Sequence, residues 1–278
     1  MKIQYLGTGA SEAIPATFCQ CEVCEKARIT GGKEIRARSG VIIDGTMLID
    51  FPPDIFYSAL RSNVLISEVR DIIFTHSHND HCDAAQVMYR AHSVYAKRRE
   101  DSNYATHLYG NETVMKTVNL PENLQTMDFT CINPFESFTV YGGIKVTPLL
   151  AEHAANEKCY IFIVEKDGKR FLYGNDSGLF PDITMEYLQG IYIDCISLDC
   201  TGVMLKCERG HMGLEADIKL GNMLIKQGTA DNKTMFIAHH FSHNGFIPDG
   251  RYYSTEEFEK IAGGYGFKVS YDTMIVEV

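Results

Sequence analysis

The chain has 278 residues, of which 45% are hydrophobic, and a formal net charge of -10 at pH 7. This length and apolar content can bury a large core, and without linkers, repeats or low-complexity segments we expect one domain over residues 1–278. The acidic balance argues against long nucleic acid as a partner, because proteins that bind polyanions carry a basic face.

The first residues contain no apolar stretch long enough for a signal peptide, and no segment approaches the roughly 18 apolar residues that span a membrane. We therefore expect a cytoplasmic protein that has no membrane partner. The sequence does not fix the oligomeric state, and a homodimer stays open.

A cluster of thiols follows the first predicted strand, Lys2 to Leu6, and its glycine loop, Leu6 to Ala10. Cys19, Cys21 and Cys24 form a C-x-C-x2-C pattern, which is typical of zinc and iron–sulfur sites. A fourth ligand would have to come from elsewhere in the chain. The alternative is a loop of reduced thiols without a metal.

The densest group of metal-ligand side chains follows the predicted buried strand Val69 to Thr75. His76, His78, Asp80 and His81 fall within six consecutive positions, where a strand runs out into a loop. In extended backbone His76 and His78 point the same way, whereas the turn displaces Asp80 and His81 toward a second point in space. One ion can hardly use all four side chains, so the pattern predicts two metal ions.

Two further expectations concern the surroundings of this motif. Asp83 to Arg99 is predicted to form a helix, whose basic end Lys97-Arg98-Arg99 would complement the helix dipole. Asp50 follows the predicted strand Met47 to Ile49, where a turn before Pro52 is one interpretation of it.

Three later strands each end at a candidate ligand. Ile144 to Leu150 precedes Glu152 and His153, Arg170 to Tyr173 precedes Asp176, and Thr234 to Ala238 precedes His239 and His240. The simplest distribution gives one metal His76, His78 and His153 and the other metal Asp80, His81 and His240, with Asp176 bridging both. His239 should point to the opposite face of its strand from His240.

His243 is the best candidate to complete the cysteine cluster. It lies three residues after His240, so one histidine can face the active site and the other a separate metal. With Cys19, Cys21 and Cys24 it would form a closed tetrahedral set, which suits a structural zinc that contributes folding free energy.

The candidate catalytic residues are Asp80 and His211. His211 lies in the glycine-flanked loop Arg209 to Gly213, before a predicted amphipathic helix that carries Leu214 and Leu224. A leaving alkoxide needs a proton, which a histidine in such a loop can supply. The alternative is an exposed loop histidine with no catalytic role.

The H-x-H-x-D-H pattern at residues 76–81, followed in order by His153, Asp176 and His240, resembles the metallo-β-lactamase superfamily from Lys2 through His243. The resemblance implies an α/β fold, an αββα sandwich of two mixed β-sheets flanked by helices, with a binuclear hydrolytic site along one edge. The cysteine insert after the glycine loop resembles, more narrowly, the phosphodiesterase branch associated with the carbon–phosphorus lyase pathway. In that branch a histidine after the Asp-Cys strand end, here Asp199-Cys200, is the proton donor, which corresponds to His211. Asp50 resembles the family's aspartate after an early strand, which implies, as the alternative to a turn residue, that it orients a ligand histidine.

These features predict a binuclear metal-dependent hydrolase. Two cations that share Asp176 would lower the pKa of a bridging water to roughly 7, and they would stabilise charge on a phosphoryl group. The expected substrate is a small phosphodiester, cyclic or derived from a nucleotide. A His/Asp site accepts zinc, manganese or nickel, so the identity of the active-site metals is left open.

Three alternatives share the fold: an iron-dependent oxidoreductase, a tRNA-processing nuclease and a non-catalytic carrier of cofactor biosynthesis. The carrier branch loses active-site ligands, whereas this chain keeps all seven of the predicted ones, which favours catalysis. Residues 101–128 and 244–253 are neither ligands nor clear core, and we expect them to form the walls of the substrate pocket.

Overall fold

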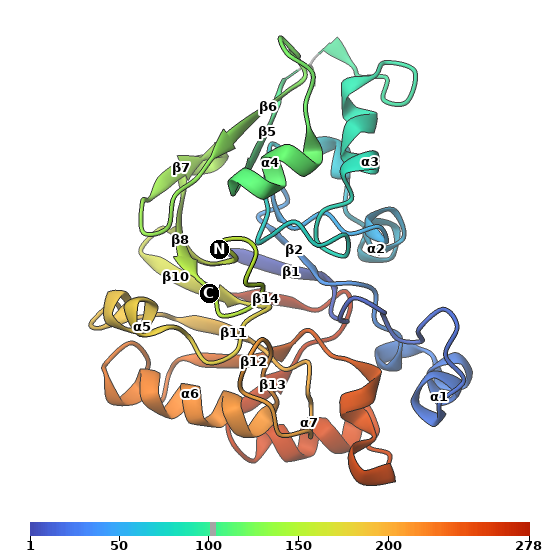
Figure 1. The fold of residues 1–278 in the computed structure, drawn as a ribbon, viewed down its shortest axis with the longest axis vertical. Coiled ribbons are helices and arrows are strands. Elements are labelled where there is room, and N and C mark those ends of the chain that lie inside the picture. The colour runs from blue at the N-terminus through green and yellow to red at the C-terminus, as the bar shows by residue number, and fades with distance from the viewer. Residues whose placement is uncertain (101–103) are drawn as a thin grey trace.

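Residues 1–100 and 104–278, which the computed structural model describes, form two seven-stranded mixed β-sheets with helices on both outer faces (Figure 1). The first sheet contains, in spatial order, β14 (Ile275–Glu277), β1 (Lys2–Gly7), β2 (Gly40–Ile43), β3 (Met47–Ile49), β4 (Asp71–Ile73), β5 (Thr106–Gly110) and β6 (Met127–Cys131). The second contains β13 (Phe267–Val269), β12 (Met235–His239), β11 (Cys195–Asp199), β10 (Lys169–Gly174), β9 (Tyr160–Lys166), β8 (Ile144–Leu150) and β7 (Phe138–Val140). The predicted αββα sandwich is confirmed.

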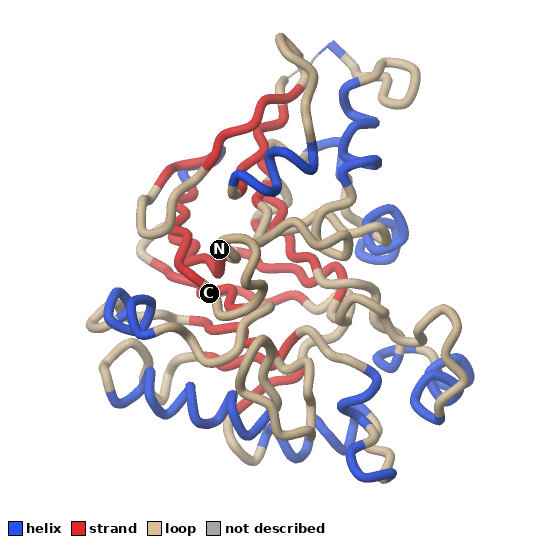
Figure 2. The backbone as a smooth tube through the Cα atoms, viewed as in Figure 1, coloured by secondary structure: helices blue, strands red, loops and turns tan. Residues whose placement is uncertain are grey.

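The helices of the described chain are α1 (Glu22–Thr30), α2 (Ile55–Ser62), α3 (Ala84–Val87), α4 (Glu112–Val118), α5 (Asp182–Leu188), α6 (Leu214–Lys226) and α7 (Thr255–Gly263). The strands lie between these helices in Figure 2. No helix in residues 1–100 and 104–278 is long and apolar enough to cross a membrane.

Alternation along each strand builds the layers of the core. In β10, Phe171 and Tyr173 pack between the two sheets, whereas Leu172 packs toward the helices of the second sheet. In β4, Ile73 faces the other sheet and Ile72 faces the helices of the first. Because side chains alternate with a period of two, each central strand contributes to two apolar layers at once.

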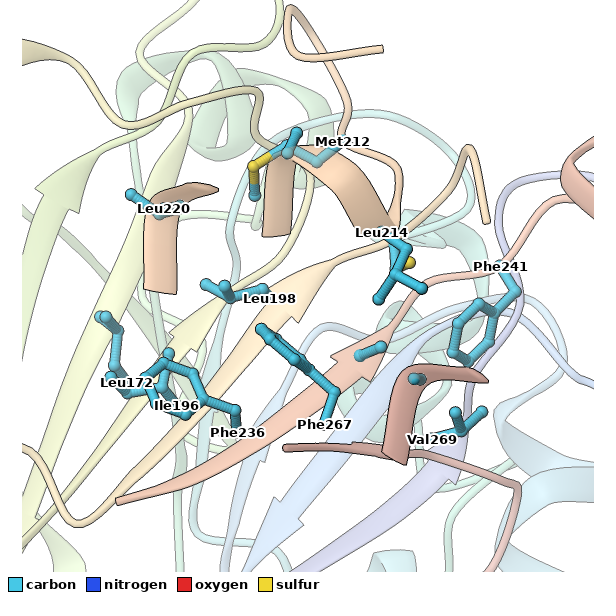
Figure 3. Packing of buried hydrophobic residues seen from close by; sticks show 14 of the residues in the cluster. Leu172, Ile196, Leu198, Met212, Leu214, Leu220, Phe236, Phe241, Phe267 and Val269 are labelled. Carbon is cyan, nitrogen blue, oxygen red and sulfur yellow. The ribbon is translucent and has the colours of Figure 1, made fainter. Parts of the chain in front are cut away.

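Helices α6 and α7 cover the outer face of the second sheet. Figure 3 shows Leu214 and Leu220 of α6 facing the sheet residues Leu198 and Phe236, all of them almost fully buried. Helices α2, α3 and α4 cover the first sheet in the same way (Figure 1). Both sheets are thus buried on two faces and form a rigid support for the loops at their edges.

The expectation of one helix from Asp83 to Arg99 is wrong. Helix α3 ends at Val87, a 3₁₀ turn follows over Met88–Ala91, and the backbone of His92 is extended. Arg90 and Arg98 donate hydrogen bonds of 3.0 and 2.7 Å to the carbonyl of Tyr104, so tertiary contacts fold this segment back on the domain. The basic residues 97–99 therefore do not complement a helix dipole.

Candidate metal centre

The predicted ligands come from the carboxyl ends of neighbouring parallel strands. Strand β4 lies parallel to β3 and leads into the loop of residues 76–81, while β10, β11 and β12 run parallel in the other sheet. Asp176 follows β10, and His240 follows β12. Parallel strands end at the same edge of a sheet, so these side chains meet there. His153 joins them from the end of β8.

His76, His78 and His153 form one cluster, in which a ring nitrogen of each lies within 4.8 Å of the others. His153 has a second contact of 3.0 Å, from its Nδ1 to the carbonyl of Gly210. Burial, and then the neighbouring His81, hold the pKa of His76 well below its ordinary value, so that its ring is neutral. A neutral imidazole is the form that binds a metal.

Asp80, His81 and His240 form a second cluster with the same spread of ligand atoms. Asp176 lies against it, with its Oδ2 2.5 Å from His81 Nε2 and its Oδ1 3.1 Å from His240 Nε2. The predicted distribution of seven ligands over two clusters therefore agrees with the geometry. Asp176 also groups with His76 and His81, which brings it into contact with both clusters.

Asp50 contacts the ring nitrogen of His81 that faces away from the cluster, in agreement with the role of orienting a histidine. Its Oδ2 lies 2.8 Å from His81 Nδ1, and its Oδ1 accepts a hydrogen bond of 2.8 Å from the Thr75 backbone. Asp50 also has a positive φ of 64°, a strained backbone for a non-glycine residue. This contact leaves Nε2 of His81 free to face the cluster.

His239 points away from the centre, as predicted from strand alternation. Its Nδ1 lies 2.9 Å from the Ser270 hydroxyl, and its ring packs against Tyr5 and Tyr173 inside the sandwich. Burial keeps the pKa of His239 well below its ordinary value. It is a buried neutral histidine of the core.

His211 reaches the centre from its loop and stacks on His240, with ring centroids 5.7 Å apart. Its Nδ1 lies 2.8 Å from Asp199 Oδ2 and 3.6 Å from Asp176 Oδ1. Burial alone would lower the pKa of His211, but the Asp199 carboxylate outweighs it and raises the pKa to about 9. His211 is therefore a protonated imidazole beside the ligands at neutral pH.

Three supporting carboxylates were missed from the sequence. Asp199 holds His211 and the Met212 backbone, Glu152 accepts a hydrogen bond from the Gly210 backbone, and Glu157 accepts from Ser77. Asp199 was detectable, since it ends β11 at the same edge as the ligands. In the sequence, Glu152 stands out only as the neighbour of His153. Glu157 lies in a loop, and no local pattern marks it.

The cysteine cluster assembles as predicted. Cys19, Cys21, Cys24 and His243 each offer one ligand atom within 4.8 Å of the others. His243 Nδ1 lies 3.7 Å from Cys19 Sγ and 3.3 Å from Cys21 Sγ. His240 has a positive φ of 63°, and this turn after β12 separates the two histidines into different clusters.

The active-site cavity has a volume of about 440 Å³. Its lining combines ligand residues with small polar side chains: Ala10, Ser11, Glu12, His78, Asn79, Asp80, His153, Asp176, Thr201, His211, His240, Ser242 and Asn244. No lysine or arginine belongs to this lining within the described chain.

The expected pocket walls are largely wrong. Residues 104–128 do not line the active-site cavity, and 101–103 lie outside the described residues. From the second expected segment, Asn244 lines the cavity, whereas Phe246 packs with Phe241 and Phe258 in the core. Most of the lining instead comes from side chains that follow strand ends, such as Thr201 and Ser242.

The residues present fit divalent cations. Nε2 of His76 and Nε2 of His240 are buried and form no hydrogen bond among the described residues, although His240 Nε2 lies 3.1 Å from the Asp176 carboxylate. Burial lowers the pKa of His81, but the carboxylates of Asp176, Asp50 and Asp80 outweigh it and raise this pKa well above its ordinary value. The negative charge of these carboxylates therefore favours a positive charge in the cluster. Unpaired imidazole nitrogens beside buried carboxylates are donors suited to a divalent metal ion.

A family model described as a beta-lactamase superfamily domain matches residues 46–240. No curated protein matches the chain significantly.

Three solved structures are similar to this chain in fold. A diphosphatase from the PhnP family is 22% identical with a TM-score of 0.74, and the match covers 100% of this chain and 97% of the diphosphatase chain. Zn²⁺-bound PqqB from Methylobacterium extorquens is 14% identical with a TM-score of 0.74 and full coverage of both chains, 100% and 100%. Human tRNase Z, short form, is 15% identical with a TM-score of 0.60, covering 100% of this chain and 99% of its own.

Proposed function

The chain belongs to the β-lactamase superfamily, and we propose that it is a binuclear metal-dependent phosphodiesterase acting on a small substrate. The observation that carries this proposal is the position of Asp176, whose two carboxylate oxygens face His81 and His240 separately. A carboxylate that faces two ligand clusters is suited to bridging two cations.

His76, His78 and His153 would hold one ion, Asp80, His81 and His240 the other, with Asp176 shared. Such a pair of ions, when bound, supplies a hydroxide nucleophile at neutral pH and neutralises charge on a phosphoryl oxygen. The predicted catalytic role of Asp80 is then to hold one ion, because its carboxylate also lies 3.2 Å from His81 Nε2.

His211 is the proposed proton donor to the leaving group. It lines the active-site cavity, and Asp199 holds its Nδ1, so Nε2 is left to face a substrate. A proton on that nitrogen neutralises the alkoxide that departs when the phosphodiester bond breaks. The raised pKa of about 9 keeps this proton in place at neutral pH.

The size and charge of the cavity support a small substrate. A cavity of about 440 Å³ fits a molecule of a few hundred daltons, and its lining has no lysine or arginine within the described chain. A nuclease that grips a long RNA would need a basic path to the site. The complete ligand set argues against a non-catalytic carrier.

We also propose a structural zinc ion at Cys19, Cys21, Cys24 and His243. Three thiolates and one imidazole close a tetrahedral site with no position for substrate. The support is that all four donor atoms lie within 4.8 Å of one another.

The test combines metal content with turnover. Protein loaded with zinc or manganese should hold about three ions per chain and cleave bis(p-nitrophenyl) phosphate, and chelation should abolish cleavage until metal is restored. His153→Ala should lose cleavage, whereas His107→Ala, which changes an exposed pair with Asp128, should keep it. Absence of cleavage with every divalent ion tested would reject the proposed function.

A further inference from the structure

A second cavity, of about 590 Å³, lies on the outer side of the first sheet, behind the loop of metal ligands. Its apolar surface comes from buried side chains, among them Ile72 and Met127 of the sheet, Val87 of α3 and Val69 of the loop before β4. Phe51 separates the two regions, because its side chain lines this cavity while its backbone N–H donates to the His81 carbonyl at 2.7 Å.

Basic side chains line the other part of this cavity. Arg90, Lys97, Arg98 and Arg99 all belong to its lining, and Glu68 is the one acidic residue there within the described chain. Glu68 already accepts a hydrogen bond of 3.3 Å from the Tyr104 hydroxyl and lies 3.8 Å from Arg99. The cavity therefore carries a surplus of positive charge.

Two of these guanidinium groups converge on a single acceptor. Arg90 and Arg98 both donate to the Tyr104 carbonyl, and their guanidinium carbons lie 5.5 and 4.3 Å from the Tyr104 ring centre. Arg70 lies over the same ring at 3.0 Å. Like charges gathered in this way repel one another unless an anion lies between them.

The same groups have unused donors. Nε of Arg90 and Nη2 of Arg98 are buried without a hydrogen-bond partner in the described chain. Burial, and then the repulsion from Arg98, lower the pKa of Arg90 to about 10. A buried guanidinium donor without an acceptor costs free energy, which a bound carboxylate or phosphate would recover.

We propose that this cavity binds a small amphiphilic anion. The apolar body of the ligand packs against Ile72, Val87 and Met127, and its carboxylate or phosphate accepts hydrogen bonds from Arg90 and Arg98. The volume of about 590 Å³ lies within the usual range of small-molecule sites. The active-site cavity differs in character, because histidines, carboxylates and small polar side chains line it and no lysine or arginine of the described chain does.

The test is calorimetric titration of the full-length, metal-loaded protein with three probes that share a ten-carbon chain: decanoate, decyl phosphate and decyltrimethylammonium. One molecule of decanoate or decyl phosphate should bind per chain, and the tighter of the two identifies the preferred head group. The cationic probe should bind at least about tenfold more weakly, because its head group meets the arginines. Absence of anion binding, or equal binding of the cation, would overturn the proposal.

Variants then locate the site. Arg90→Met with Arg98→Met should weaken anion binding at least about tenfold, since two charge-assisted hydrogen bonds are lost. The matched control is Arg251→Met, whose side chain is 66% exposed beside Glu257 and which should bind as the wild type does. If the double variant does not fold, the single change Arg98→Met is used, with a smaller loss expected. Wild-type affinity in a folded variant would contradict the assignment, and phosphodiester turnover verifies the fold independently.

Discussion

Asp176 divides its carboxylate between two histidines, with Oδ2 2.5 Å from His81 Nε2 and Oδ1 3.1 Å from His240 Nε2. The residue is buried and has a φ of 48°, a backbone conformation that is costly outside glycine. Asp50 and His240 share this positive φ. Three residues of the ligand clusters and their support thus have this backbone conformation, which is common at functional sites.

Replacing Asp176 with Asn should remove the shared negative charge while keeping the shape of the side chain. We expect the variant to retain fewer than two active-site ions and to lose more activity than the 10–100-fold that changes beside a ligand typically cause. Metal content and phosphodiester turnover measured on the same sample check this. Full metal occupancy together with wild-type turnover would exclude a bridging role.

Asp50→Asn tests the support of a ligand rather than a ligand itself. The amide would no longer fix the orientation of His81 through Nδ1, so metal affinity should fall by roughly 10–100-fold. Raising the metal concentration should then restore most of the turnover, which it should not do for Asp176→Asn. A competition titration with a chromogenic chelator measures the affinity directly. An unchanged affinity would mean that Asp50 only shapes the turn.

The role of His211 predicts a pH dependence. Only the protonated ring donates a proton, so with a pKa raised to about 9 activity should be retained below that pH and lost as the pH rises through it. Asp199→Asn removes the main cause of the raised pKa, and the fall in activity should move to lower pH. The effect should be large for a substrate with an alkoxide leaving group and small for p-nitrophenolate. Equal profiles for both leaving groups would argue against proton donation.

Asp217 predicts a pH dependence of stability that is separate from the metal centre. It is fully buried on α6, and neither carboxylate oxygen has a hydrogen-bond partner in the described chain. Burial raises the pKa of Asp217 well above its ordinary value. Two smaller effects oppose each other, because the Cys200 thiol lowers this pKa and the charge of Asp199 raises it. The folded state thus keeps a proton that the unfolded state releases above its pKa of about 3.9, so this residue lowers stability as the pH rises.

Urea denaturation at several pH values tests this sign. Asp217→Asn has no such proton to lose, so it should not share the loss of stability that the wild type shows as the pH rises. The free energy of unfolding of the variant minus that of the wild type should therefore increase from pH 5 to pH 8, by about 1 kcal/mol or more. A difference that stays constant across this range would show that Asp217 is ionised in the folded protein.

The cysteine cluster should contribute to stability and not to chemistry. Cys24→Ser should lower the melting temperature, with roughly 2–4 °C for each kcal/mol of lost zinc binding, and should release one ion. Cys131→Ser is the matched control, because Cys131 is exposed and lies outside every ligand cluster of the described chain. An unchanged melting temperature for Cys24→Ser would contradict a structural metal.

The sequence was most informative where chemistry and strand ends coincide. The side chains predicted from the motif at 76–81, from the three later strand ends and from the C-x-C-x2-C pattern come together in clusters, because a buried strand and a run of His, Asp or Cys residues each leave a local signal. The segment after Val87 was mispredicted, because contacts of Arg90 and Arg98 with Tyr104 override helix propensity.

Supporting residues were the least predictable part of the site. Glu157 lies 80 residues from Ser77, and only the fold brings its carboxylate to the backbone between His76 and His78. The prediction of the pocket walls was wrong for the same reason, since composition cannot tell which loop folds over a strand end.

Anomalous diffraction at the zinc edge from crystals of zinc-loaded protein locates the bound metal ions directly. A binuclear centre with a separate structural zinc predicts three peaks per chain: one on each side of the Asp176 carboxylate, and a third among the cysteines and His243. A single peak among the histidines, with none beside the second oxygen of Asp176, would contradict a binuclear centre.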